Sequence, residues 1–320
     1  MPTCLTTRFT ERFGLDHPIA LAPMDKISGG ALAAAVSEAG GLGLIGGGYA
    51  DGPWLAQALA QAGNRPVGVG FITWSALEHP ETVEIALNAN PKALMVSFGD
   101  AEPLVEAAQA KGIPVIWQVQ TLAQAKQALA AHADVIVAQG QEAGGHGMSR
   151  GLMSLLPTIR DLAGKEQIIL GAGGIADGRG LAAVMMLGGD GVLMGTRFWA
   201  CQEASGPQSA KDRMLGLGGD DTIRSKVFDV ARDAGWPWHF TGRVVRNRFL
   251  NQWHDDPDLQ ARAPEAQAAY DASDEEDYGT RVLIAGEALD LIRDLPTAAE
   301  IVERTSAEAA SLLRGAASTL

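Results

Sequence analysis

The sequence predicts a (β/α)8 barrel, the TIM barrel fold, with a small insertion near its C-terminal end. Short apolar runs rich in β-branched residues alternate with Ala-rich and Leu-rich segments of helical period from about residue 19 to residue 200. This alternation is the pattern of repeated βα units around a parallel sheet. The runs number eight, whereas an open doubly wound sheet usually ends at five or six strands. The closed barrel is therefore favoured over the open sheet.

The expected strands and helices follow one another in strict order. The strands are expected at 19–22, 42–45, 66–71, 93–97, 114–119, 134–138, 167–171 and 191–194. The helices are expected at 30–39, 53–62, 81–88, 101–110, 122–131, 152–162 and 178–187. The helical segments are rich in Ala, Leu, Glu and Gln, which are good helix formers.

After the eighth strand the pattern changes. Residues 221–234 are expected to be helical, 255–279 to be acidic and exposed, and 281–313 to return to helical period. We therefore expect a barrel over residues 1–200, an insertion or lid subdomain over 201–280, and C-terminal helices over 281–320 that close the barrel. The insertion would lie over the C-terminal ends of the strands, where barrel enzymes place their active sites.

Composition and charge exclude several classes of function. The net charge of −13 opposes binding to phosphodiester backbones and anionic lipids, so neither a nucleic acid nor a membrane is an expected partner. The first residues contain no apolar signal segment, and no run of about 18 apolar residues follows, which favours a cytoplasmic protein. The two cysteines, Cys4 and Cys201, are too few for a disulfide framework or a metal cluster. No metal site is expected.

Glycine is in excess, with 39 in 320 residues, and many glycines follow the last three strands. The segments LGAGGIADGR at 170–179 and VLMGTR at 192–197 end strands seven and eight. Backbone N–H groups can approach a phosphate closely where no Cβ intervenes, and barrels commonly bind phosphate at these two loops. The alternative interpretation is a pair of tight turns that need glycine only for positive φ.

The loop after the sixth strand, VAQGQEAGGHG at 137–147, contains the expected catalytic residue, His146. A histidine at the C-terminal end of a barrel strand faces the reaction centre, and its pKa lies near neutrality. His239, in an aromatic part of the insertion, is a second candidate. The alternative for each is a purely structural histidine.

The first strand ends in ALAPM at 20–24. Proline fixes the backbone, and the polarizable Met24 would suit stacking on a flat ring. The alternative is that Met24 packs in the core.

The glycine-rich segment at 40–48 lacks the register of a dinucleotide-binding fingerprint.

Together these motifs resemble the nitronate monooxygenase family, formerly called 2-nitropropane dioxygenases. The motifs are ALAPM at 20–24, GGLGLIGGGY at 40–49, AQGQEAGGHG at 138–147, GAGGI at 171–175, LMGTRF at 193–198 and TGRVVRN at 241–247. The EAGGH element is shared with flavin-dependent enoyl-acyl-carrier-protein reductases and with NADH:quinone reductases on the same scaffold.

The resemblance implies that FMN binds without a covalent bond at the C-terminal ends of the barrel strands. The residues that it places against the isoalloxazine ring are Ala22, Pro23 and Met24. Those that it places at the flavin or its ribityl chain are Gln139 and Gly144. Those that it assigns to the phosphate are Gly173, Gly174, Met194, Gly195 and Thr196.

Two positions depart from the family pattern. Gly70 ends the third strand where many relatives have an asparagine that touches the flavin, so only a backbone contact is expected there. Gln118 ends the fifth strand where some relatives have a lysine. The loss of a cation beside the flavin would alter its redox tuning.

The function implied by the resemblance is oxidation of alkyl nitronates, such as propionate 3-nitronate, with O2 to a carbonyl product and nitrite. His146 would stabilise the anionic nitronate when protonated, or remove the α-proton of a nitroalkane when neutral. One alternative is NAD(P)H-dependent reduction of quinones or enoyl thioesters, and another is a flavin-binding or phosphate-binding barrel without enzymatic activity.

A cluster of aromatic and basic residues in the insertion has no assigned role. Its members are Trp236, Trp238, Arg243, Arg246, Arg248 and Trp253. The cluster either packs the insertion onto the barrel, as buried Trp and extended Arg side chains commonly do, or contacts the substrate or a second copy in a homodimer.

Overall fold

The computed structural model describes residues 5–318 of the chain, so Cys4 lies outside the described residues. Eight parallel strands form one sheet in the order β1-β9-β8-β6-β5-β4-β3-β2. A bridge between Ala20 and Leu42 brings the two ends of this sheet together. The predicted (β/α)8 barrel is confirmed. The strands are β1 (Ile19–Leu21), β2 (Leu44–Gly48), β3 (Gly68–Ile72), β4 (Leu94–Ser97), β5 (Val115–Val119), β6 (Val135–Gln139), β8 (Ile168–Ala172) and β9 (Gly191–Met194).

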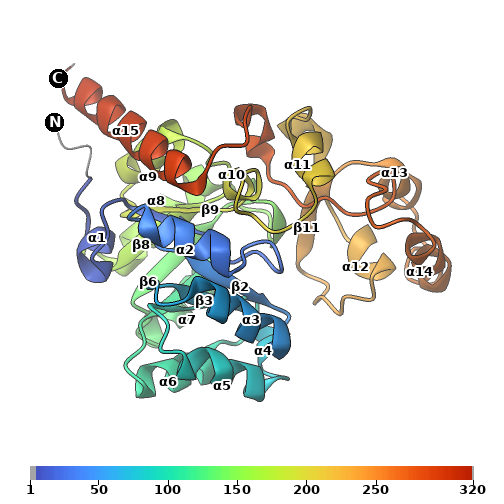
Figure 1. Cartoon of the computed structure of the whole chain (residues 1–320), viewed down its shortest axis with the longest axis horizontal. Helices are drawn as coiled ribbons and strands as arrows, with labels where there is room; N and C mark the ends of the chain where they lie inside the picture. Colours follow the sequence, from blue (N-terminus) through green and yellow to red (C-terminus); the bar gives the residue numbers. More distant parts are fainter. Residues whose placement is uncertain (1–4, 319–320) are drawn as a thin grey trace.

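The helices between the strands cover the outside of the barrel. They are α2 (Gly30–Glu38), α3 (Gly52–Ala62), α5 (Pro80–Asn88), α6 (Glu102–Ala110), α7 (Leu122–Ala130), α8 (Leu152–Ala163) and α9 (Gly178–Met186), with the shorter α1 (Arg8–Phe13), α4 (Thr73–Ala76) and α10 (Thr196–Trp199). The final helix, α15 (Ala298–Ala317), lies along α9 and also contacts α2 (Figure 1). It begins at a capping box formed by Thr297 and Glu300.

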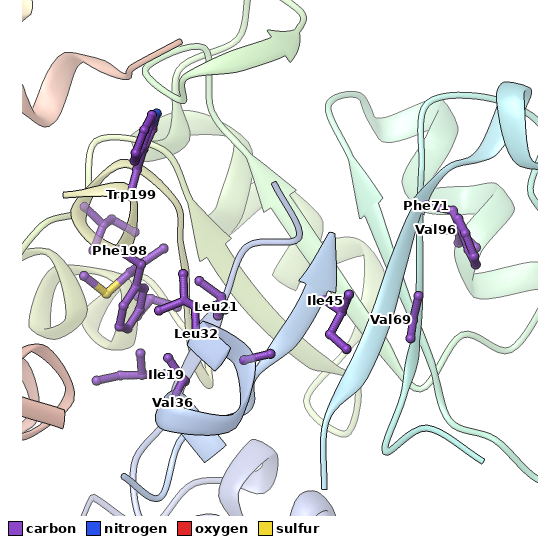
Figure 2. Packing of buried hydrophobic residues seen from close by; sticks show 14 of the residues in the cluster. Ile19, Leu21, Leu32, Val36, Ile45, Val69, Phe71, Val96, Phe198 and Trp199 are labelled. Carbon is purple, nitrogen blue, oxygen red and sulfur yellow. The ribbon is translucent and has the colours of Figure 1, made fainter. Parts of the chain in front are cut away.

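Alternate residues of the strands face opposite sides of the sheet, which gives the barrel two apolar layers. In β1, Ile19 and Leu21 face outward and pack with Leu32 and Val36 of α2 (Figure 2). Ala20, between them, belongs to a separate inner cluster made by the inward-facing residues of the other strands. Phe9 and Phe13 of α1 are also part of that inner cluster. The barrel interior is therefore a packed core.

A buried carboxylate connects three parts of the barrel wall. Asp190, at the start of β9, forms ion pairs with Arg8 at 2.8 Å and with Arg160 of α8 at 2.7 Å. The backbone N–H of Ile169 in β8 donates to the same carboxylate at 2.9 Å. Since the Asp190 side chain is only 5% exposed, its partners replace nearly all of its hydration.

The substitution Asp190→Ala is expected to lower the free energy of unfolding by about 3–5 kcal/mol, because it leaves two guanidinium groups without their buried partner. Urea unfolding followed by circular dichroism measures this loss. Glu265→Ala is the matched control, since Glu265 pairs with Arg262 on the exposed surface and should change the midpoint little. Equal urea unfolding midpoints for Asp190→Ala and Glu265→Ala would contradict the stabilising role of the buried Asp190 carboxylate.

The insertion forms a second, smaller layer beside the barrel mouth (Figure 1). Its own apolar cluster includes Phe228, Phe249 and Trp253. Its elements are α11 (Gln208–Met214), η1 (Gly219–Asp221), β10 (Thr222–Ser225), α12 (Val227–Ala231), β11 (Thr241–Val245), α13 (Arg248–Trp253) and α14 (Ala263–Asp271), and η2 (Glu287–Leu291) follows them. The division of the chain at residues 200 and 280 stays a prediction.

Three local expectations for this region were wrong. Residues 221–234 are not one helix, because β10 pairs with β11 before α12 begins. The acidic stretch 255–279 is not wholly exposed, since Tyr270 of α14 is buried. The final helix begins only at Ala298, after Pro296 of the preceding segment. None of the helices in residues 5–318 is long and apolar enough to cross a membrane.

Candidate active site

A cavity of about 630 Å³ opens at the C-terminal ends of the barrel strands. Its volume lies within the range of small-molecule and cofactor sites. The insertion contributes part of its wall through Arg232, Trp236 and residues 270–284. The predicted site residues that line it are Ala22, Pro23, Met24, Gln118, Gln139, Gly144, His146, Gly173, Gly174, Gly195 and Thr196.

Gly70 and Met194 do not line the cavity but support the residues that do. A Cβ added to Gly70 would lie 2.3 Å from Cγ of Pro23, so this glycine makes room for Pro23. Met194 is buried, and its carbonyl accepts a hydrogen bond of 2.8 Å from the N–H of Ala22. His239 also lies outside the cavity; it is exposed and rests against Phe240.

Two neighbouring strand ends form a cradle of backbone N–H groups. Gly173 and Gly174, after β8, have φ values of 102° and 72°, which favour glycine. Gly195 and Thr196 begin α10, directly after β9. None of these four N–H groups donates a hydrogen bond to an acceptor within residues 5–318. Successive N–H groups in such turns bind anions, so the cradle fits a phosphate.

Two glutamines line the cavity at the ends of β5 and β6. Gln139 donates to the carbonyl of His146 at 3.1 Å and accepts from Gln120 at 2.8 Å. Gln118 is buried, yet its amide makes no hydrogen bond to any described residue. A buried amide normally has a partner. Gln118 is therefore available to a polar edge of a bound group.

His146 lies on β7 (Gly145–Gly147), a short strand that pairs with β11 of the insertion opposite Gly242. Its Nε2 lies 2.8 Å from Oδ1 of Asp229 in α12, and its ring stacks on Trp236 with centroids 3.4 Å apart and planes 5° apart. Burial lowers the pKa of His146 below its usual value, and the nearby Asp229 carboxylate opposes this shift. The neutral imidazole, which can accept a proton, therefore predominates at neutral pH.

Aromatic side chains form the wall beside His146. Trp236 donates a hydrogen bond of 2.7 Å from Nε1 to the hydroxyl oxygen of Tyr49. The ring of Phe98 meets Trp236 edge to face, with centroids 5.1 Å apart. All three aromatic side chains line the cavity. They give the site an apolar compartment next to a potential base.

The loop that carries His146 is fixed at several points. The Glu142 carboxylate accepts hydrogen bonds from the N–H of Leu152 at the start of α8, so this glutamate caps a helix. Arg224 and Arg243 both donate to the carbonyl of Gln141, at 3.2 and 2.9 Å. These contacts come from β10 and β11. The insertion therefore holds the loop in place.

The members of the aromatic and basic cluster at 236–253 lie in different places: within the insertion, on the surface and at the cavity. Arg243 is buried and pairs with Glu287 at 2.6 Å, and Trp253 is buried in the core of the insertion. Arg248 pairs with Asp277 on the surface. Only Trp236 reaches the cavity, whereas Trp238 is 60% exposed. Arg243 and Trp253 therefore pack within the insertion and Trp236 belongs to the site. The other three members, Trp238, Arg246 and Arg248, are exposed.

Sequence reasoning missed Asp229, Tyr49 and Phe98. Tyr49 ends the glycine-rich segment GGLGLIGGGY, so its position after β2 was an available signal. Asp229 is one of 38 acidic residues and lies in the insertion, where no barrel pattern fixes the direction of its side chain. No group of three or more His, Cys, Asp or Glu residues that could hold a metal ion occurs within residues 5–318.

Comparison with known proteins agrees with the geometry. The family profile for nitronate monooxygenase matches residues 6–78 and 64–308. A nitronate monooxygenase from Neurospora crassa is 33% identical over 90% of this chain and 88% of its own length. The structures of FabK from Thermotoga maritima and of nitroalkane oxidase from Streptomyces ansochromogenes are each 26% identical, with TM-scores of 0.87 and 0.77. The first alignment covers 99% of this chain and 100% of FabK, and the second covers 96% and 99%. The chain belongs to the nitronate monooxygenase family of oxidoreductases.

Proposed function

We propose that the protein oxidises alkyl nitronates of the propionate 3-nitronate type with O2, giving a carbonyl product and nitrite, and that its flavin is FMN. The observation that carries the proposal is a buried His146, paired with Asp229, at a cavity that also holds a cradle of unpaired N–H groups. A base and an anion-binding cofactor site in one apolar cavity suit a small anionic substrate.

The residues present fit FMN. The N–H groups of Gly173, Gly174, Gly195 and Thr196 would hold the phosphate, since they have no other acceptor among the described residues. Residues 22–24 would lie against the flat ring, and the free amide of Gln118 would meet its polar edge. When bound, the flavin supplies the electron transfer that oxidises the substrate.

The side chain of His146 can serve the substrate in two protonation states. The neutral imidazole can take the α-proton of a nitroalkane, which breaks the C–H bond and leaves its electron pair in the nitronate. The protonated imidazole can then stabilise the negative charge of that nitronate. Tyr49, Phe98 and Trp236 form the apolar wall beside this position and would exclude water from it.

Anaerobic mixing tests the proposal. The holoprotein with propionate 3-nitronate is expected to lose its flavin absorbance, to regain it on admission of air, and to release nitrite. Addition of NADH in place of the nitronate is expected to leave the flavin oxidised. Rapid bleaching by NADH without nitrite formation from any nitronate would contradict the proposal.

That contrary result would favour the second candidate, an NAD(P)H-dependent reductase of quinones or enoyl thioesters. One observation favours it: the cavity extends beyond the barrel mouth to Tyr270, Tyr278 and Arg281, which leaves space for a larger partner than a small nitronate. The homodimer stays a prediction, and light scattering of the purified protein measures it.

A further inference from the structure

We propose that Asp229 is a positioning residue that determines which nitrogen of His146 reacts. By accepting a hydrogen bond from Nε2, Asp229 keeps the proton on that nitrogen and leaves Nδ1 as the atom that takes the substrate proton. The inference rests on the proposed function of His146 as a base, and it adds an acidic residue to the part of the site that the insertion forms with Trp236.

The first support is the chemistry of the contact. Nε2 of His146 and Oδ1 of Asp229 are 2.8 Å apart, and the two side chains are only 10% and 11% exposed. An ionised carboxylate only accepts hydrogen bonds, so Nε2 must be the donor. In a neutral imidazole the other nitrogen then carries the lone pair. Nδ1 makes no hydrogen bond to any described residue, so that lone pair is free.

The second support is that the buried Asp229 carboxylate has a single hydrogen bond and one long ion pair. Its Oδ2 is buried without a hydrogen-bond partner among the described residues. The nearest cation, Nζ of Lys226, is 3.9 Å from Oδ2 and donates instead to the carbonyl of Pro237 at 3.0 Å. A buried carboxylate with one hydrogen bond is costly for folding. A buried polar atom left without a partner calls for an explanation, and here the one hydrogen bond of the carboxylate goes to His146.

The third support is the restraint on the imidazole ring. Its plane is parallel to Trp236, and its backbone is fixed by pairing of β7 with β11. A rotation that tilts the ring would break the stack, and a half-turn that keeps the ring in plane would break the bond to Asp229. The ring therefore presents Nδ1 in one orientation, which is the arrangement that an efficient general base requires.

The charges that face His146 fix the sign of the pH effect. Asp229 raises the pKa of His146, whereas Lys226 and Arg224 lower it, as does burial. The substitution Asp229→Asn removes the negative charge and so lowers the pKa of His146 further. Proton removal needs the neutral imidazole, so the acidic limb of the kcat/KM profile for a neutral nitroalkane is expected to move to lower pH.

Asp229→Asn should also affect the kcat/KM values of two substrates to different extents. In Asp229→Asn, the amide can donate to Nε2 and so populates the tautomer in which Nδ1 carries the proton. We expect kcat/KM for a neutral nitroalkane to fall at least about tenfold. The value for the corresponding preformed nitronate, which needs no proton removal, should change much less. Asp229→Glu should recover part of the loss, and flavin content should not change.

The decisive measurement is the ring nitrogen spectrum of the 15N-labelled holoprotein, with His146 assigned from its absence in His146→Gln. The wild type is expected to show the Nε2–H tautomer, and Asp229→Asn to show loss of that preference and a lower pKa of His146. Asp233→Asn, which removes an exposed charge after the same helix, is the control and should match the wild type.

The possible results separate this inference from the proposed function. An Nδ1–H tautomer in the wild type, or an unchanged tautomer and pKa in Asp229→Asn, would overturn the role of Asp229. An altered tautomer in a protein that oxidises no nitronate would support the positioning role and reject the proposed function. If Asp229→Asn does not fold, the tautomer of His146 in the wild type and in Asp229→Glu still tests the positioning role of Asp229.

Discussion

Replacement of His146 by glutamine is expected to lower kcat/KM for neutral nitroalkanes by at least about 100-fold through loss of the base. It is expected to lower kcat/KM for nitronates as well, through loss of the imidazolium that stabilises their charge, while the flavin stays bound. His146 lines the cavity, but none of its contacts involves the N–H cradle at Gly173 and Gly195. The glutamine amide can still donate to Asp229, so the buried carboxylate keeps a partner. Steady-state kinetics together with the flavin spectrum measures both expectations.

His146→Ala should lose the same activity and also some stability, because it leaves the Asp229 carboxylate buried without its hydrogen bond. Comparison of His146→Gln with His146→Ala therefore distinguishes a loss of catalytic activity from a loss of stability. His239→Ala is the control, since His239 is exposed and outside the cavity. Wild-type kcat/KM in His146→Gln would show that the assigned role is wrong.

The substitution Gly195→Asp is expected to weaken FMN binding by on the order of 100-fold or more. A carboxylate there would lie among the N–H groups proposed to hold the phosphate, and like charges about 4 Å apart repel by roughly 4 kcal/mol at an effective dielectric constant of 20. The backbone tolerates a side chain at this position, because φ is −108° and an added Cβ would lie 3.5 Å from Cβ of Ala22.

Gly195→Ala is the matched control, because it adds the same Cβ without a charge. It should retain most of the affinity for FMN, measured by fluorescence quenching during titration of the apoprotein. Equal losses in both variants would indicate steric exclusion from the cavity. Unchanged affinity in Gly195→Asp would contradict the assignment of the phosphate to this cradle.

The parts of the structure that the sequence predicts are those governed by local periodicity. Each barrel strand is a short apolar run between helix formers, so the order and approximate bounds of the eight βα units follow from the pattern. The glycines at 173–174 were also predictable, because their positive φ values favour glycine. Gly195 was predicted only from its place directly after the last strand, since its φ of −108° is open to other residues. His146 was identified by its position in the glycine-rich loop after the sixth strand.

The contacts that sequence alone could not predict depend on packing across long separations. The backbone contact of Gly70 to the flavin stays a prediction, but the close approach of Pro23, which leaves no room for a Cβ at Gly70, could not be predicted. Residues 222–225 have no strand signal strong enough to override the neighbouring helical pattern, and they become β10 only because β11 pairs with them. Asp229 is 83 residues from His146 in sequence, and the hydrogen bond between them follows from how the insertion docks.

Pairing of β7 with β11 also determines when during folding the site can form. The barrel strands can pair in sequence as each βα unit is completed, but β7 stays an unpaired edge until residues 241–245 have been added. Until then β7 lacks the partner strand that holds His146 beside Asp229 and Trp236. Since β11 follows every barrel strand in the sequence, the surroundings of His146 can be completed only after the strands of the barrel have been made.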